Sequence, residues 1–115
     1  MSLRIEVGPV EDIPEGEAHV VDSSKNGTED HIAVFHAEDG AFDALNDTCS
    51  HEVASLADGW IEGSQVECPA HSAKFCLKTG RAMCMPAVVA VRTHKVTVED
   101  GHVYLHPGVP AGEAF

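Results

Sequence analysis

Two short segments, each with one cysteine and one histidine, constrain this chain more than any other feature. Cys49 and His51 stand two residues apart, and Cys68 and His71 stand three apart farther along the chain. In extended backbone, side chains two residues apart point the same way, so Cys49 and His51 can face one object together. Pro69 restricts the backbone between the second pair. The pattern predicts a metal site to which two loops each supply one thiolate and one imidazole.

Two kinds of metal centre use two cysteines and two histidines. Zinc accepts this set, but its common arrangement groups cysteine with cysteine and histidine with histidine. In a Rieske [2Fe-2S] cluster, two histidines replace two cysteines on one of the two irons. Because each loop supplies one residue of each kind, the order favours a [2Fe-2S] cluster bound by Cys49, His51, Cys68 and His71. A zinc-stabilised interaction module without a redox role is the alternative from another class.

Mixed ligation also sets the charge of such a cluster. The charges of two ferric ions, two sulfides, two thiolates and two neutral imidazoles sum to about zero, so reduction leaves the cluster with only about one net negative charge. A cluster with four thiolates would be far more anionic, which explains why imidazole ligands raise the reduction potential. We expect the added electron on the histidine-bound iron, since that centre is the less electron-rich of the two.

Length and pattern predict an all-β domain. The 115 residues suffice for one domain over residues 1–115, with the ligand loops in a subdomain at approximately 46–86. No sustained helical period is present, and short apolar runs separated by Gly and Pro favour an antiparallel β-sandwich or partly open barrel. A turn at Asp100 and Gly101 would place Val98 opposite Val103. The predicted strands cover residues 3–7, 18–21, 31–37, 41–45, a pair within 59–67, 88–91, 95–99 and 102–105, with a turn at 23–28.

The charge balance limits the partners. The chain has 19 Asp and Glu residues against 7 Lys and Arg, a formal net charge of -12. This excess repels nucleic-acid backbones and anionic membranes and would attract a basic patch on a protein, although it would also serve solubility alone. The first residues lack a signal peptide's pattern, and no apolar run reaches the length of a membrane span, so we expect a cytoplasmic protein. A reducing compartment favours a metal site over two disulfides.

The chain resembles the Rieske ferredoxins that serve bacterial aromatic-ring-hydroxylating dioxygenases of the biphenyl and toluene type. The resemblance rests on the two Cys-His segments, on residues 75–80 and on Pro86, and it extends through residues 12–16 and the closing strands. It implies a Rieske-type fold in which two ligand loops form a small cluster-binding subdomain. It further implies that Cys49 and Cys68 bind the inner iron, that His51 and His71 bind the outer iron at the protein tip, and that Pro86 belongs to a third, covering loop.

The resemblance implies an electron carrier of aromatic hydrocarbon catabolism. Such a protein takes single electrons from a flavin-dependent NAD(P)H ferredoxin reductase and passes them to a terminal Rieske oxygenase, docking briefly through its histidine tip. The sequence shows no nucleophile, base or mononuclear iron triad, so we expect no enzyme activity from the chain alone. The alternative within the same cofactor class is the Rieske-type small subunit of another reductase, such as nitrite reductase.

Two departures from the Rieske proteins of respiratory complexes predict a low reduction potential. Ala54 and Ala70 occupy the places of the extra cysteines that form a disulfide between the ligand loops there. Ala73 and Phe75 occupy the places of hydroxyl residues that hydrogen-bond to sulfur. Without those donors, the charge gained on reduction is less stabilised, so we expect a value at the lower end of the Rieske range of about −150 to +300 mV.

The remaining reactive or aromatic side chains are interpreted as structural. Cys76 and Cys84 are expected to pack as small hydrophobic residues, with a redox-sensing pair as the alternative. Trp60 and Phe75 are expected to pack under the ligand loops. The other histidines show no ligand spacing and are expected on the surface or half-buried: residues 19, 31, 36, 94, 102 and 106.

Overall fold

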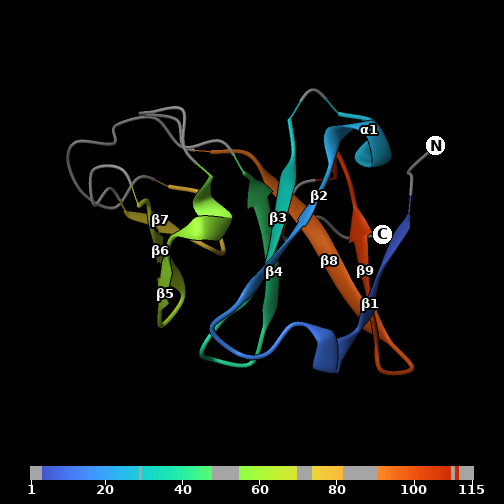
Figure 1. The fold of residues 1–115 in the computed structure, drawn as a ribbon, viewed down its shortest axis with the longest axis horizontal. Helices are drawn as coiled ribbons and strands as arrows, with labels where there is room; N and C mark the ends of the chain where they lie inside the picture. The colour runs from blue at the N-terminus through green and yellow to red at the C-terminus, as the bar shows by residue number, and fades with distance from the viewer. Residues whose placement is uncertain are drawn as a thin grey trace.

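In a computed structural model of the protein, the described residues are 4–28, 30–47, 55–69, 74–81, 91–109 and 111. They form nine strands, one helical turn and two 3-10 turns (Figure 1). In chain order these elements are β1 (Ile5–Pro9), η1 (Val10–Asp12), β2 (Ala18–Val21), α1 (Ser23–Asn26), β3 (Ile32–His36), β4 (Phe42–Asn46), η2 (Leu56–Asp58), β5 (Trp60–Glu62), β6 (Gln65–Glu67), β7 (Lys74–Cys76), β8 (Thr93–Glu99) and β9 (His102–His106).

The strands make two antiparallel sheets. The large sheet has the order β1-β9-β8-β4-β3-β2, and the small sheet has the order β5-β6-β7. The large sheet curves until its two edge strands lie on either side of a gap of about 210 Å³, lined by residues of β1 and β2. The all-β prediction of a partly open barrel is therefore confirmed, and the small sheet lies beside the barrel (Figure 1).

Strand β3 is the centre of the packing because both of its faces are buried. Ile32 and Val34 point into a core inside the barrel, together with Val103 and Leu105 of β9. Ala33 and Phe35 point the other way, into a second core that the small sheet covers. Side chains alternate across a strand, so a strand buried on both faces reads as a continuous apolar run, as this segment does.

The β8–β9 hairpin follows the predicted register. Val98 pairs with Val103 and Val96 pairs with Leu105. Asp100 and Gly101 have φ values of 52° and 77°, which suit a two-residue hairpin turn. The apolar face is only partly covered, since Val98 is 48% exposed near the end of the hairpin.

Several local predictions need correction. The first strand runs over Ile5–Pro9, so Arg4 lies outside it and it ends two residues beyond the predicted end. The sequence does not predict β7, because its three residues are too few for a periodic pattern. The turn at 23–28 contains the helical turn α1, where the Asp22 carboxylate accepts a hydrogen bond from the Ser24 N–H at 2.9 Å. Of the strand expected at 88–91, residues 88–90 lie outside the described residues and Val91 lies outside the strands.

Turn contacts fasten the small sheet to the barrel. Lys78, which follows β7, places its Nζ 2.9 Å from Asp43 and 3.2 Å from Asp39 in the β3–β4 hairpin. The same hairpin reaches the β5–β6 turn, where the Glu38 N–H donates to the Gly63 carbonyl at 3.1 Å. The second core and these contacts together fix where the small sheet sits.

Candidate metal centre

One of the four predicted ligands, Cys68, lies among the described residues. It directly follows β6 and is 1% exposed. Its side chain belongs to the second core, with Val66, Phe75 and Leu77. The other three predicted ligands, Cys49, His51 and His71, lie outside the described residues, so their assignment stays a prediction.

A buried carboxylate, Asp47, joins the two ends of the segment that contains Cys49 and His51. Asp47 is 5% exposed and follows β4. Its carboxylate accepts hydrogen bonds from the Ser55 hydroxyl at 2.6 and 2.8 Å and from the Ala57 N–H at 3.0 Å. Its carbonyl accepts from the Leu56 N–H at 2.7 Å. Residues 47 and 55–57 are thereby held together, so the chain leaves and returns at one place.

The segment that contains His71 is closed by strand pairing. Glu67 at the end of β6 lies opposite Lys74 at the start of β7. A glycine ties this closure to the first one: a Cβ at Gly59 would lie 1.9 Å from the Glu67 carbonyl oxygen. Only glycine therefore lets the chain after η2 approach the backbone just before Cys68.

The ends of residues 82–90, which include Cys84 and Pro86, are closed in a similar way. The Val91 N–H donates to the Gly80 carbonyl at 2.9 Å, and the Cys76 N–H donates to the Arg81 carbonyl at 2.9 Å. A Cβ at Gly80 would lie 2.0 Å from the Val91 carbonyl oxygen. Three segments thus start and end on one framework, as a centre with ligands from separate loops requires.

The residues present fit a [2Fe-2S] cluster with mixed ligands. Cys68 supplies a thiol at the end of an apolar core, which keeps water from one side of the sulfur. The sequence provides a second thiol and two imidazoles from the neighbouring segments, a set known for Rieske clusters. Within the described ranges, no group of three or more His, Cys, Asp or Glu side chains forms a rival metal site.

Two histidines expected near the surface are buried instead. His94 is 1% exposed and His106 is 8% exposed. His94 accepts the Gly108 N–H at its Nδ1, 2.9 Å away, so its Nε2 carries the proton that it shares with the Asn46 side chain at 2.7 Å. Burial, with a smaller contribution from Arg92, lowers the pKa of His94 to about 4. This neutral ring braces the end of β4 immediately before Asp47, a role that spacing could not reveal.

The structural interpretation of Cys76 and Trp60 needs correction. Cys76 is half-buried and stands on the outer face of the small sheet. Burial raises the pKa of its thiol, but hydrogen bonds from the Thr79 hydroxyl and from backbone N–H groups of Thr79 and Lys78 outweigh burial, so the pKa is lowered. Trp60 is 61% exposed, whereas Phe75 is fully buried as predicted. Cys84 lies outside the described residues.

Comparison with known proteins agrees with this arrangement. The family profile of the Rieske [2Fe-2S] domain matches residues 4–95. The 3-phenylpropionate/cinnamic acid dioxygenase ferredoxin subunit of Escherichia coli K12 is 47% identical over 103 residues, which cover 89% of this chain and 92% of the relative. Among solved structures, a chain from the complex of reduced oxygenase and oxidized ferredoxin in carbazole 1,9a-dioxygenase is 30% identical with a TM-score of 0.83, covering 96% of this chain and 97% of that one. The ferredoxin of Sphingomonas yanoikuyae B1 is 31% identical with a TM-score of 0.79, covering 90% and 98%. The chain belongs to the Rieske [2Fe-2S] family and carries a Rieske-type [2Fe-2S] cluster.

Proposed function

We propose that this protein carries single electrons to the terminal oxygenase of an aromatic-ring dioxygenase system. The observation that carries the proposal is the 47% identity, over 89% of the chain, with a dioxygenase ferredoxin subunit. A solved relative with the same fold comes from a complex of ferredoxin with oxygenase. The protein is an electron-transfer component and not the catalytic subunit.

In this proposal, Cys49 and Cys68 bind one iron of the cluster, and His51 and His71 bind the other. The cluster, when bound, takes up and gives back one electron. The burial of Cys68 supports this assignment because its thiol lies at the end of β6, in the apolar core of the small sheet. The imidazole-bound iron is then left for the side that partner proteins reach, so docking occurs through the histidine tip.

The reduction potential should lie at the lower end of the Rieske range. Phe75 stands at one of the two places where high-potential relatives carry a hydroxyl group, and its ring is fully buried in the second core. It can donate no hydrogen bond to a cluster sulfur. The other such place, Ala73, also lacks a donor side chain. The added negative charge is therefore less stabilised than in those relatives.

The upstream partner in this proposal is a flavin-dependent NAD(P)H ferredoxin reductase, and the compartment is the cytoplasm. Within the described residues, no helix has the length and apolar character needed to cross a bilayer. The net charge of -12 favours encounter with proteins that present Lys and Arg around their docking sites. Redox partners of this kind usually meet through small, short-lived interfaces.

Two alternatives give different results in simple measurements. The small subunit of a nitrite reductase would copurify with a large partner, and the identity to a dioxygenase ferredoxin subunit argues against this role. A zinc-stabilised module would be colourless and could not be reduced, and the match to the Rieske profile argues against it.

The test has two stages. Protein prepared anaerobically and reduced with dithionite should give an electron paramagnetic resonance spectrum with a lower average g value than an all-thiolate cluster. His71→Ala should lose this signal, whereas His19→Ala, at an exposed strand position, should keep it. The reduced protein should then deliver electrons to the terminal oxygenase of the Escherichia coli 3-phenylpropionate/cinnamic acid dioxygenase. A silent spectrum would contradict the cluster, and a normal spectrum without electron delivery would contradict the carrier role.

A further inference from the structure

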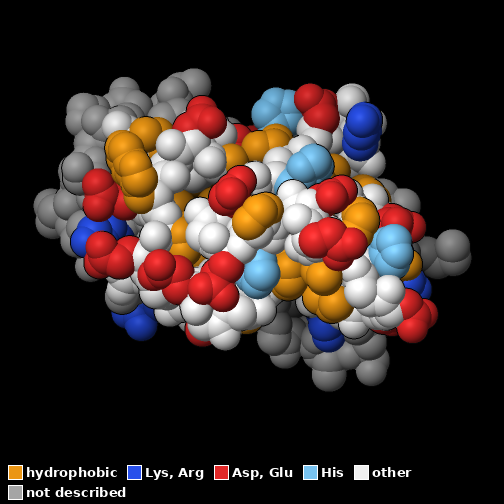
Figure 2. Space-filling model, turned by 60° about the horizontal axis from the view of Figure 1, so that its bottom comes forward, with side chains coloured by type: hydrophobic (Ala, Val, Ile, Leu, Met, Phe, Trp, Pro, Cys, Tyr) orange, Lys and Arg blue, Asp and Glu red, His pale blue; other side chains and the backbone are white. Residues whose placement is uncertain are grey.

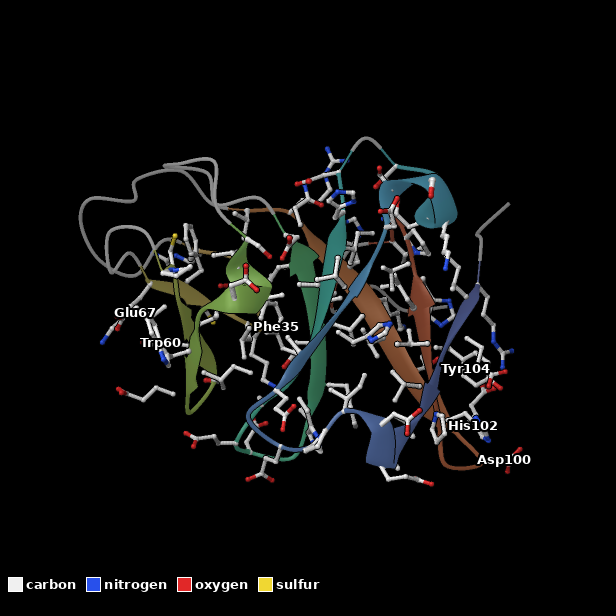
Figure 3. The ribbon with its side chains drawn as sticks, in the orientation of Figure 1. Phe35, Trp60, Glu67, Asp100, His102 and Tyr104 are labelled. Carbon is white, nitrogen blue, oxygen red and sulfur yellow. The ribbon has the colours of Figure 1, made fainter. Side chains whose placement is uncertain are left out.

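Among the described residues, Trp60 is the most exposed large hydrophobic side chain, with 61% of its surface accessible. It stands on β5, on the outer face of the small sheet, while its neighbour Ile61 packs against the second core. Pairing places Glu67 of β6 directly opposite Trp60 (Figure 3). An exposed tryptophan contributes little to folding, whereas tryptophan is among the residues that most often dominate the energy of protein interfaces.

The surroundings of Trp60 are acidic. Asp58 and Glu62 flank it in sequence and are both exposed, and Glu67 faces it across the strand pair. Figure 2 shows more acidic than basic side chains over the face that it presents. This arrangement suits a partner protein that presents an apolar recess for the tryptophan ring, with Lys and Arg side chains around it.

The charge also changes sign across the small sheet. Lys74 of β7 lies on the far side of Glu67, in the same cross-strand row as Trp60. The chain from residue 68 to residue 98 contains no Asp or Glu, and its basic residues are Lys74, Lys78, Arg81, Arg92 and Lys95. Lys78 is paired with Asp39 and Asp43, so Lys74 is the basic side chain that β7 itself contributes. A basic partner surface is therefore favoured over β5 and β6 and disfavoured at Lys74, which favours one orientation of docking.

The position connects this surface with electron transfer. Glu67, the cross-strand partner of Trp60, immediately precedes Cys68, a proposed cluster ligand. A protein that covers Trp60 consequently lies beside the proposed cluster site. The hairpin tip at Asp100 lies at the opposite end of the molecule (Figure 3).

We propose that Trp60, Glu62 and Glu67 form a docking surface for the terminal oxygenase, with Trp60 inserting into an apolar recess bordered by basic side chains. The inference rests on the proposed function and adds to it a second contact area, on the side of the small sheet, next to the histidine tip. Trp60 supplies the affinity, and the acidic side chains supply the encounter rate and the orientation.

The experiment measures electron transfer from the reduced holoprotein to the terminal oxygenase of the Escherichia coli 3-phenylpropionate/cinnamic acid dioxygenase, by stopped flow at increasing protein concentration. Trp60→Ala should raise the half-saturating concentration about tenfold, as expected for truncation of a dominant interface tryptophan. The midpoint potential and the electron paramagnetic resonance spectrum should not change. Trp60→Phe should restore much of the affinity. Val98→Ala, which shortens an exposed apolar side chain on β8, is the matched control and should behave as wild type.

Charge variants test the orientation. Glu62→Gln with Glu67→Gln should slow the encounter by roughly two- to threefold at low salt, Lys74→Gln should accelerate it, and these differences should vanish at high salt. Asp100→Asn removes one negative charge at the far end and should have a smaller effect than Glu67→Gln alone. Wild-type affinity in Trp60→Ala would overturn the proposal, as would a defect confined to electron uptake from the reductase. Wild-type protein that delivers no electrons would instead contradict the proposed function.

Discussion

At one end of the molecule, β8 and β9 pair along seven- and five-residue strands, whereas at the other end β5, β6 and β7 have three residues each. The long hairpin is held by many similar backbone contacts and a local turn. The small sheet packs on the second core, but the closures of its loops depend on single residues: two glycines at close backbone approaches and one buried carboxylate. Single substitutions should therefore be tolerated at the hairpin end and should damage both the fold and the cluster at the other end.

The strongest test of this difference compares glycines. Gly59→Ala would place its Cβ 1.9 Å from the Glu67 carbonyl, so the backbone must move, and we expect a loss of roughly 3 to 5 kcal/mol with poor cluster retention. Gly101→Ala meets no atom within 4 Å and carries only the cost of its positive φ, about 1 to 2 kcal/mol. Urea denaturation and visible absorbance would measure both. Equal losses in the two variants would contradict the contrast between the ends.

The next effect concerns Asp47. Asp47→Ala removes the acceptor of the Ser55 hydroxyl and the Ala57 N–H inside the protein, and we expect a loss of about 2 to 3 kcal/mol. Asp47→Asn keeps one acceptor oxygen and should lose less. Because these bonds close the segment with the predicted ligands Cys49 and His51, the cluster should be released faster to an iron chelator. Ser55→Ala should reproduce part of the effect, whereas an unchanged release rate in Asp47→Ala would exclude a role in closing the loop.

A third effect depends on pH. The pKa of His94 is lowered by burial to about 4, below its ordinary 6.5, so between these pH values the unfolded chain binds a proton that the folded chain does not. The stabilisation is complete above pH 6.5 and is lost as the pH falls toward 4. His94→Gln should flatten this part of the curve of unfolding free energy against pH. The exposed His19→Gln variant should leave the slope in place, and an unchanged slope in His94→Gln would show that other groups cause it.

The two ends also differ in how far the sequence could predict them. At the hairpin end, alternating Val residues and the turn at Asp100 and Gly101 are local signals, and the predicted register was confirmed. At the other end, the family and the cluster could be inferred from the Cys-His segments. The supporting residues could not, because Asp47 and Gly59 act across whole loops and His94 acts on a residue 48 positions away, so none of them belongs to a local period.

The smallest effect sharpens the comparison between ion pairs at the two ends. Lys78 bridges Asp39 and Asp43 and so ties the small sheet to the barrel, whereas Arg4 pairs with Glu99 beside the hairpin at 2.6 Å. Partly exposed ion pairs contribute little, so Lys78→Met and Arg4→Met should each lower the unfolding free energy by at most about 1 kcal/mol.

The two variants should differ in the hydrogen exchange of backbone amides between the small sheet and the barrel. Lys78 joins the part of the chain that follows β7 to the barrel, so its loss should increase hydrogen exchange at Glu38 and Gly63, whose N–H groups donate hydrogen bonds across that junction. Removal of Arg4 should leave those amides unchanged, and high salt should erase much of the Lys78 effect. Equal exchange in both variants would mean that the second core alone holds the small sheet in place.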